Sequence, residues 1–265
     1  MTIRAVLFDL DDTLLWDERS VKESFEATCQ AAAEAVSVDP AKLEEEVRRE
    51  ARTLYESYEP FPFTKQIGIN PFEALWANFT EGEQQEFRQL QKLAPEYRTV
   101  SWTRGLKALG VDDAELGYKL GELFPKERRS RPLVYEETFQ VLDELKGQVK
   151  LLMLTNGSPD LQKEKIAGFE QLASYFDHIV ISGSFGQGKP AAAIFHHALQ
   201  LLDVGAEEAL MVGDKLTTDI LGANGTGIRS VWLNRHHVSR SDEIVPAYEI
   251  DSLWGLRPIM EQLKR

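Results

Sequence analysis

The chain contains a single cysteine, Cys29, so it cannot form an internal disulfide. A chain without disulfides fits a reducing compartment. Cys29 lies in a segment whose apolar residues have helical spacing, and we interpret it as a small buried apolar residue rather than as a nucleophile.

Long apolar runs are also missing, and basic residues are fewer than acidic ones. No apolar run approaches the roughly 20 residues that a membrane-spanning helix needs, and no long apolar segment of the kind found in a signal peptide follows a basic start at the N-terminus. We therefore expect a cytoplasmic protein without a membrane partner. The 30 Lys and Arg residues against 43 Asp and Glu residues give a net charge of −13, which argues against non-specific binding to nucleic acid. An anionic substrate is compatible with this balance, because the local charge of a site can oppose the net charge.

Short apolar segments alternate with helical patterns from Val134 onward. The strands predicted there are residues 149–154, 178–182, 209–212 and 228–233. The segment Ala5–Phe8 has the same unbroken apolar composition, which is typical of a strand buried on both faces. Strands that alternate with helices predict a parallel sheet with helices on both faces. The predicted fold class is therefore α/β, with a Rossmann-like parallel sheet as the core.

Residues 16–131 have no convincing strand and several helix-start signals. Ser20-x-x-Glu23 is a capping box, and Asp39-Pro40 and Asn70-Pro71 place a capping residue before proline. The predicted helices are 20–37, 40–58, 70–79, 83–93, 95–109 and 113–129, with a break at residues 60–63. We therefore predict an α-helical domain, residues 16–131, inserted into a core domain formed by residues 1–15 and 132–265.

The strand Ala5–Phe8 ends abruptly at acidic residues, namely Asp9, Asp11 and Asp12, which are followed by Thr13. Carboxylates this close repel one another, and burial adds a desolvation penalty. A divalent cation would hold them together, and hard oxygen ligands suit Mg²⁺. On these residues alone, an Asx-rich turn is an equally good interpretation.

The strand at 149–154 is followed by Thr155, Asn156, Gly157 and Ser158. A hydroxyl, an amide and a glycine beside a helix N-terminus can form a cradle for phosphate or for an oxyanion. A simple helix cap is the alternative, but it would use Ser158 alone and leave Thr155 and Asn156 unexplained.

Two later strand ends also carry charged residues. Lys189 stands among glycines and before Pro190, where it can reach a phosphate, although a lone loop lysine is usually solvated. The strand at 209–212 leads to Asp214, which we expect at the same sheet edge as Asp9. Asp219 follows at a helix start, where the helix dipole alone would favour a carboxylate.

Taken together, these motifs resemble the haloacid dehalogenase (HAD) superfamily of phosphotransferases, and the resemblance covers residues 3–15 and 133–235. The motifs that carry it occur in the family's order: Asp9-Leu-Asp11-Asp-Thr13, Thr155, Lys189-Pro190 and Gly213-Asp214-x4-Asp219. The helical insertion is similar to the cap of this family. The stretch from Thr155 to Lys189 resembles the branch of phosphoserine phosphatases, N-acylneuraminate-9-phosphatases and pyrimidine nucleotidases, and fits the phosphoserine-phosphatase-like group best.

The resemblance implies roles for three acidic residues. Asp9 would be the nucleophile that forms an aspartyl-phosphate. Asp11 would protonate the leaving alcohol and then deprotonate the attacking water. Mg²⁺ would be held by Asp9, by the backbone carbonyl of Asp11 and by Asp214.

The resemblance also implies a set of supporting groups. The implied phosphate-binding groups are Thr155, the backbone of Asn156 and of Gly157, and Lys189. Thr13 would steady the loop after the first strand, and Asp219 would orient a metal-bound water or Lys189.

The presence of an acid at Asp11 separates functions within the family, because members that release halide lack an acid at this position. The expected function is therefore a Mg²⁺-dependent phosphatase acting on a small phosphomonoester, with O-phospho-L-serine as the candidate substrate. The alternatives are a nucleotidase, a sugar-acid phosphatase similar to N-acylneuraminate-9-phosphatase, a phosphomutase and a non-catalytic interaction protein. No nucleic acid partner is expected.

Substrate choice in this family comes from the cap, which the resemblance implies would cover the site. Lys65, Arg98, Trp102 and Arg104 are candidate ligands for a substrate carboxylate. For each of them, ordinary helix surface or helix core is the simpler interpretation.

Overall fold

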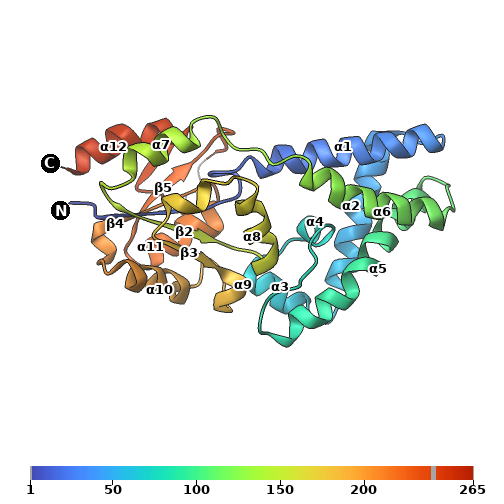
Figure 1. The fold of residues 1–265 in the computed structure, drawn as a ribbon, viewed down its shortest axis with the longest axis horizontal. Coiled ribbons are helices and arrows are strands. Elements are labelled where there is room, and N and C mark those ends of the chain that lie inside the picture. The colour runs from blue at the N-terminus through green and yellow to red at the C-terminus, as the bar shows by residue number, and fades with distance from the viewer. Residues whose placement is uncertain (1, 240–242, 265) are drawn as a thin grey trace. The chain divides into compact units, whose positions relative to one another are not determined.

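A parallel β-sheet is the centre of the computed structural model, which describes residues 2–239 and 243–264. Within these residues the sheet has six strands in the order β3-β2-β1-β4-β5-β6 (Figure 1). The strands are β1 (Ala5–Phe8), β2 (Lys150–Thr155), β3 (His178–Ile181), β4 (Ala209–Gly213), β5 (Arg229–Leu233) and β6 (Tyr248–Ile250). The predicted α/β class with a parallel sheet is confirmed.

Alternate residues of β1 face opposite sides of the sheet, and both sides are buried. Val6 and Phe8 belong to one apolar cluster, whereas Ala5 and Leu7 belong to another. Successive side chains of a strand point to opposite faces, so an unbroken apolar run is what a strand covered on both faces requires.

Helices pack on both faces of the sheet. The helices after residue 137 are α7 (Thr138–Leu145), α8 (Pro159–Ala167), α9 (Ser182–Phe185), α10 (Ala192–Leu202), α11 (Leu221–Gly225) and α12 (Leu256–Leu263). α7 and α12 lie on one face of the sheet, and α10 and α11 lie on the other (Figure 1). The central strand β1 is thus shielded from water on both faces, and only the strand ends can present polar groups to a ligand.

The chain divides into two compact units. The first contains the sheet and consists of Met1–Asp17, Val134–Gly157 and Gln162–Arg265. The second consists of Glu18–Leu133 and Ser158–Leu161, so it includes a short segment outside the predicted helical domain. Leu161 belongs to the apolar cluster of the second unit, which explains this assignment.

The second unit, which we call the cap, is helical throughout. Its helices are α1 (Asp17–Ala35), α2 (Pro40–Glu56), α3 (Phe61–Ile67), α4 (Pro71–Ala74), α5 (Gln85–Ala108) and α6 (Ala114–Arg129). α5 packs against both α2 and α6. Phe25, Trp102 and Phe124 form an aromatic group at the centre, with the Phe25 and Phe124 ring centroids 4.5 Å apart. All of residues 16–131 are described, and none of them lies in a strand.

Pro95 does not separate two helices, as the sequence had predicted, but lies inside the single helix α5. Proline removes one helical hydrogen bond and costs about 3 kcal/mol or more in a helix interior. Apolar residues on both sides of it, including Phe87, Leu90 and Tyr97, are buried in the same cluster. Packing of one continuous face therefore outweighs the local penalty.

Two shorter predictions in the cap were wrong in part. A break does separate α2, which ends at Glu56, from the next helix, but residues 61–63 already belong to α3, where Pro62 occupies the first turn and its missing N–H costs nothing. The helix predicted from Asn70 through Phe79 ends at Ala74. Phe79 has a φ of 54°, a left-handed conformation that cannot continue a helix.

The edge strand β6 was not predicted. It has only three residues, all half-buried, and pairs with β5 alone. A segment this short carries too little periodicity to be recognised from its composition.

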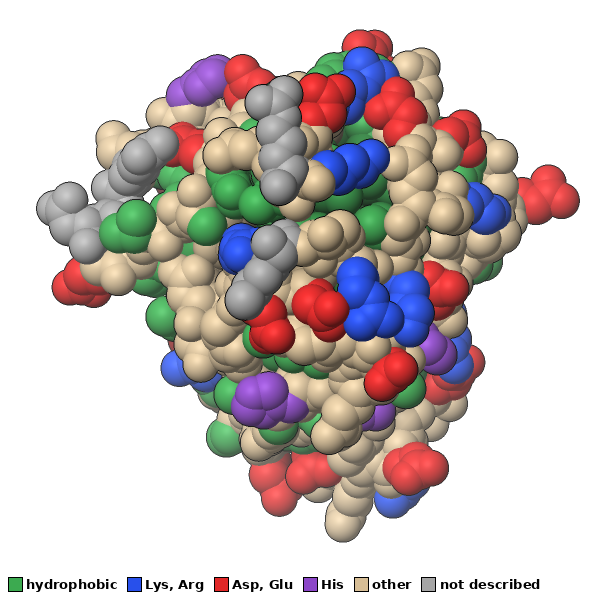
Figure 2. All heavy atoms as spheres, turned by 90° about the vertical axis from the view of Figure 1, so that its left-hand side faces the viewer, with side chains coloured by type: hydrophobic (Ala, Val, Ile, Leu, Met, Phe, Trp, Pro, Cys, Tyr) green, Lys and Arg blue, Asp and Glu red, His purple; other side chains and the backbone are tan. Residues whose placement is uncertain are grey.

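The surface carries both signs of charge. Figure 2 shows Asp and Glu side chains lying next to Lys and Arg side chains on one face. Arg4 with Glu208 and Arg257 with Glu144 are examples of such surface ion pairs. None of the helices in the described part of the chain is both long enough and apolar enough to span a membrane.

Candidate active site

The carboxyl ends of β1, β2 and β4 form one edge of the sheet. β1 lies between the other two strands, and Phe8 is in register with Met153 and with Val212. Residues that follow these strands therefore meet at one place, which is where open parallel sheets bind ligands. Asp9, Thr155 and Asp214 all belong to this edge.

Asp9 is buried at this edge and held from two sides. Its Oδ1 accepts a hydrogen bond from Lys189 Nζ at 2.6 Å, and its Oδ2 accepts one from Thr13 Oγ1 at 3.4 Å. Burial raises the pKa of Asp9 from 3.8 to about 6, although Lys189 opposes this shift. The carboxylate is thus held in a fixed orientation with restricted solvation, as a nucleophile requires.

The turn that follows Asp9 is itself built from acidic residues. Asp12 has a φ of 59° and donates its N–H to the carbonyl oxygen of Leu15 at 2.8 Å. Aspartate tolerates this left-handed conformation better than most residues do. The Asx-rich turn and the carboxylate site were alternatives in the sequence, and the structure contains both.

Lys189 joins two carboxylates in the interior. Its side chain is 2% exposed, and its Nζ lies 2.6 Å from Asp9 Oδ1 and 2.6 Å from Asp219 Oδ1. Burial lowers the pKa of Lys189, but Asp219 and Asp9 together raise it above its ordinary value. The residue is therefore a permanent buried cation and not a solvated loop lysine.

Asn156 positions the loop that carries Lys189. Its side-chain Oδ1 accepts the N–H of Lys189 at 2.8 Å, and its Nδ2 donates to the Lys189 carbonyl oxygen at 3.0 Å. The Lys189–Pro190 peptide bond is cis. The predicted phosphate ligand Asn156 thus uses its side chain on the protein, as a link between two strand ends.

Asp214 and Asp219 are brought to the same edge by a tight turn. A Cβ on Gly213 would lie 2.4 Å from Asp219 Cγ, so only glycine allows Asp219 to fold back over the strand end. Trp232, at the end of β5, donates its Nε1–H to the Asp214 carbonyl oxygen at 2.8 Å. Burial, and then the charge of Asp9, raise the pKa of Asp214 well above its usual range.

These acidic groups suit a divalent cation. One carboxylate oxygen each from Asp9, Asp214 and Asp219 lie within 4.8 Å of one another. Asp9 and Asp219 are buried and share the cation Lys189, and the half-buried Asp214 adds a third carboxylate, which leaves an excess of negative charge. An all-oxygen donor set matches Mg²⁺. Asp219 belongs to this group, although it was expected only in a supporting role. The carboxylate of Asp11 does not belong to it.

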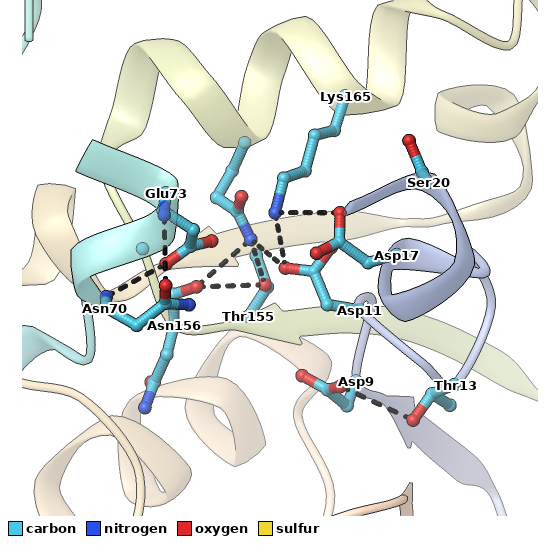
Figure 3. A network of polar contacts seen from close by, with 12 residues as sticks. Asp9, Asp11, Thr13, Asp17, Ser20, Asn70, Glu73, Thr155, Asn156 and Lys165 are labelled. Atoms are coloured by element: carbon cyan, nitrogen blue, oxygen red, sulfur yellow. Dashed lines mark hydrogen bonds and ion pairs between the residues drawn. The ribbon is translucent and has the colours of Figure 1, made fainter. Parts of the chain in front are cut away.

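Asp11 lies beside a second set of residues, shown in Figure 3. Its Oδ2 accepts hydrogen bonds from Lys165 Nζ at 2.9 Å and from Gln162 Nε2 at 3.0 Å. Burial raises the pKa of Asp11, and Lys165 opposes that shift. Gln162 and Lys165 were not predicted. Two polar residues three positions apart on α8, the helix that follows the Thr155 cradle, are the only signal that could have identified them.

The cradle after β2 differs in part from the prediction. Thr155 is buried at the strand end, and its Oγ1 accepts a hydrogen bond from Gln162 Nε2 at 2.6 Å. The N–H of Gly157, which was expected to bind phosphate, donates to Ser182 Oγ at 2.9 Å. The hydroxyl of Thr155 and the Lys189 ammonium are therefore the strongest candidates for phosphate contacts.

The candidate substrate ligands of the cap fall into two kinds. Arg98 is buried and donates to the Ala77 carbonyl oxygen at 2.5 Å and to Asn78 Oδ1 at 2.8 Å. Trp102 is fully buried in the cap interior. Lys65 and Arg104 are exposed on helix surfaces. Arg98 and Trp102 thus lie in the core of the cap, whereas Lys65 and Arg104 lie on its surface.

A family model described as haloacid dehalogenase-like hydrolase matches residues 3–227. The chain belongs to this family. Among curated proteins, this HAD-like hydrolase is 34% identical to a phosphoserine phosphatase of Thermus thermophilus over 255 residues, covering 95% of the chain and 96% of the relative. It is 28% identical to N-acylneuraminate-9-phosphatase of Mus musculus, covering 98% and 95%.

Solved structures place the HAD-like hydrolase in the same fold. YfnB of Bacillus subtilis, a HAD-hydrolase solved with bound magnesium, superposes with a TM-score of 0.66 at 21% identity, covering 98% of the chain and 99% of YfnB. The comparisons confirm the predicted family and support a phosphatase, and the relatives differ in the substrates for which they are named.

Proposed function

We propose that this protein is a Mg²⁺-dependent phosphatase that hydrolyses a small phosphomonoester through a phosphorylated Asp9. The observation that carries the proposal is the separation of two carboxylates. Asp9 is held by Lys189 and Thr13, whereas Asp11, two residues later, is held by Lys165 and Gln162. One carboxylate is thus free to act as nucleophile while the other carries a proton.

In the first half-reaction, Asp9 attacks the phosphorus atom of the ester. A bond forms between an Asp9 oxygen and phosphorus as the bond from phosphorus to the ester oxygen breaks. The proton of Asp11 goes to that ester oxygen, so the leaving group departs as a neutral alcohol. Lys189 and the Thr155 hydroxyl would stabilise the charge on the other phosphoryl oxygens.

In the second half-reaction, water attacks the phosphorus atom of phosphorylated Asp9. Asp11, now a carboxylate, takes a proton from the water. The bond between phosphorus and the Asp9 oxygen breaks, inorganic phosphate leaves, and both carboxyl groups return to their starting state.

Asp9, Asp214 and Asp219 would hold the Mg²⁺ ion, together with the backbone carbonyl of Asp11. The bound ion would neutralise charge on the phosphoryl group and orient it. The clustering of three carboxylates, two buried and one half-buried, supports this assignment.

O-phospho-L-serine is the substrate that we propose first, because the relative named phosphoserine phosphatase is 34% identical along 95% of the chain. N-acylneuraminate 9-phosphate is the second candidate, because that relative matches 98% of the chain at 28% identity. Both esters join a primary alcohol to phosphate and carry a carboxylate, so the same chemistry at Asp9 and Asp11 serves either one.

Phosphate release tests the proposal. The panel contains O-phospho-L-serine, N-acetylneuraminate 9-phosphate, a pyrimidine 5′-nucleotide, glyceraldehyde 3-phosphate and p-nitrophenyl phosphate, each with Mg²⁺ and with EDTA. We expect release with Mg²⁺ only, the highest kcat/KM for O-phospho-L-serine, and loss of more than about 10⁴-fold in Asp9→Asn.

Each part of the proposal has its own contradictory result. A higher kcat/KM for another ester would contradict O-phospho-L-serine as the substrate but would not affect the proposed mechanism. Activity that persists in EDTA would contradict the requirement for Mg²⁺. Near-full activity of Asp9→Asn would contradict the phosphorylated Asp9 intermediate. No release from any ester would favour a non-catalytic interaction protein.

A further inference from the structure

The two oxygens of the Asp11 carboxylate have different surroundings. Oδ2 accepts both hydrogen bonds, from Lys165 Nζ at 2.9 Å and from Gln162 Nε2 at 3.0 Å (Figure 3). Oδ1 is buried and has no hydrogen-bond partner among the described residues. One oxygen is thus anchored by two donors, and the other has a hydrogen-bonding capacity that no described group uses.

Both donors are themselves held in place. The Lys165 side chain is 4% exposed, and its Nζ also lies 3.5 Å from Asp17 Oδ1. Gln162 is fully buried, and its Nε2 also contacts Thr155 Oγ1 at 2.6 Å. A polar side chain with several simultaneous partners has little rotational freedom, and it passes that constraint on to the group that it binds.

Local sequence explains why Gln162 can reach this place. A Cβ on Gly157 would lie 2.8 Å from Gln162 Cδ, so a side chain there would displace the glutamine. Gln162 and Lys165 are three residues apart on α8 and therefore share one face of the helix. Gln162 therefore contacts both the Thr155 cradle and Asp11.

We propose that Lys165 and Gln162 are positioning residues that hold Asp11 by Oδ2, so that Oδ1 exchanges the proton with the ester oxygen and with the attacking water. The inference rests on the proposed function, because it assumes that Asp11 is the acid and base. It adds residues that lie outside the sequence motifs by which the family was identified. Without these two donors the carboxyl group could rotate, and proton transfer would occur less often in the correct geometry.

The leaving group offers a readout that a merely structural role would not affect. When phosphorus is transferred to Asp9 from an alkyl ester, the departing alkoxide is a strong base and needs the proton of Asp11. p-Nitrophenolate is a weak base and leaves without a proton. Because kcat/KM includes only steps up to the formation of phosphorylated Asp9, a misplaced Asp11 should lower it for alkyl esters and not for the aryl ester.

The experiment compares Lys165→Met and Gln162→Met with wild type on two substrates. One is the alkyl ester of the panel with the highest kcat/KM, and the other is p-nitrophenyl phosphate, both with Mg²⁺. For Lys165→Met we expect kcat/KM to fall about 30- to 100-fold with the alkyl ester, through kcat, and less than about fivefold with the aryl ester. Gln162→Met should show the same selectivity with a smaller loss.

Two further variants complete the design. Lys163→Met makes the same change at an exposed position of α8, and we expect wild-type values with both substrates. Lys165→Arg keeps a cationic donor and should recover most of the activity with the alkyl ester. Gln162→Met tests the inference independently should Lys165→Met fail to fold.

Equal losses with both esters, or no loss with either, would overturn the inference while wild-type activity upholds the proposed function. Wild type that releases phosphate from neither ester would contradict the proposed function itself. The two failures are therefore distinguishable in one set of assays.

Discussion

The sheet edge of the core and the interior of the cap both bury charged side chains, but they satisfy them differently. At the sheet edge, Asp9 and Asp219 share the cation Lys189, so charge is opposed by charge. In the cap, buried Arg98 donates to a backbone carbonyl and to the amide of Asn78. Burial lowers the pKa of the Arg98 guanidinium, so the cap also bears a desolvation cost, but the carboxylates of the sheet edge are in addition packed together and repel one another.

This difference helps to distinguish buried charges that serve a reaction from buried charges that serve the fold. Arg98 completes hydrogen bonds that the cap would otherwise leave open, which is a structural role. The carboxylates of the sheet edge repel one another and raise each other's pKa, which no structural role requires. Substitutions should therefore have opposite effects on stability in the two regions.

The largest expected effect on stability is in the cap. Trp102→Ala removes a fully buried ring that lies 5.9 Å from Phe25 and 6.0 Å from Phe124, measured between centroids. We expect the free energy of unfolding to fall by about 3–5 kcal/mol, because truncation leaves a cavity that packing cannot close. Urea unfolding followed by circular dichroism measures it. Tyr118→Ala, at a residue 56% exposed, is the control and should change little. Equal losses for both would contradict the comparison.

At the sheet edge we expect a substitution to increase stability rather than to decrease it. In metal-free protein, Asp9→Asn should raise the free energy of unfolding by about 1–3 kcal/mol at pH 8, because it removes one of the clustered carboxylates. Burial raises the pKa of Asp9 from 3.8 to about 6, so folding disfavours its ionised form. In wild type, the ionised Asp9 therefore lowers the free energy of unfolding fully at a pH above its pKa in the folded protein. This loss disappears once the pH falls below its pKa in the unfolded chain.

The advantage of Asp9→Asn should therefore shrink as the pH is lowered from about 6 to about 4, and vanish below that range. Urea midpoints over this pH series measure it. Asp251→Asn changes an exposed carboxylate in the same way and serves as the control. A destabilised Asp9→Asn at pH 8 would show that the carboxylate has a structural role.

A smaller loss is expected for Arg98→Met. This change keeps much of the buried volume but leaves the Ala77 carbonyl oxygen without the donor that the structure gives it. The cost should be about 1–3 kcal/mol in unfolding free energy. Arg104→Met, on the exposed face of the same helix, is the matched control. If the two variants unfolded at the same urea concentration, the buried donor would contribute nothing.

The smallest effect concerns Cys29, which is buried in the cap and free of disulfides. Burial raises the pKa of its thiol from 9.0 to about 12, so almost no thiolate forms at pH 8. We expect iodoacetamide to alkylate the native protein at least about 100-fold more slowly than the urea-unfolded chain. Mass spectrometry at timed intervals gives both rates. Comparable rates would mean that the cap opens often around α1.

The strand ends were predictable because their signal is local. Each central strand is a run of apolar residues that stops at a polar one, as at Phe8 before Asp9 and at Gly213 before Asp214. Predictions of helices and strands failed where packing overruled a local penalty, as at Pro95 inside α5, or where an element was too short to show a period, as at β6. At the sheet edge the departure was in a contact: the N–H of Gly157, expected to bind phosphate, donates to Ser182 Oγ.

By itself, the sequence determined the α/β class, the helical insertion and the residues Asp9, Asp11, Lys189 and Asp214 as one candidate site, because parallel strands bring their carboxyl ends together. Only the tertiary structure decided which side chains form hydrogen bonds and ion pairs with these four residues. Lys165 reaches Asp11 across 154 positions of the chain, and Trp232 reaches Asp214 from a neighbouring strand. Contacts between residues so far apart depend on how helices and strands pack, and the sequence around one partner does not indicate which distant residue it will meet.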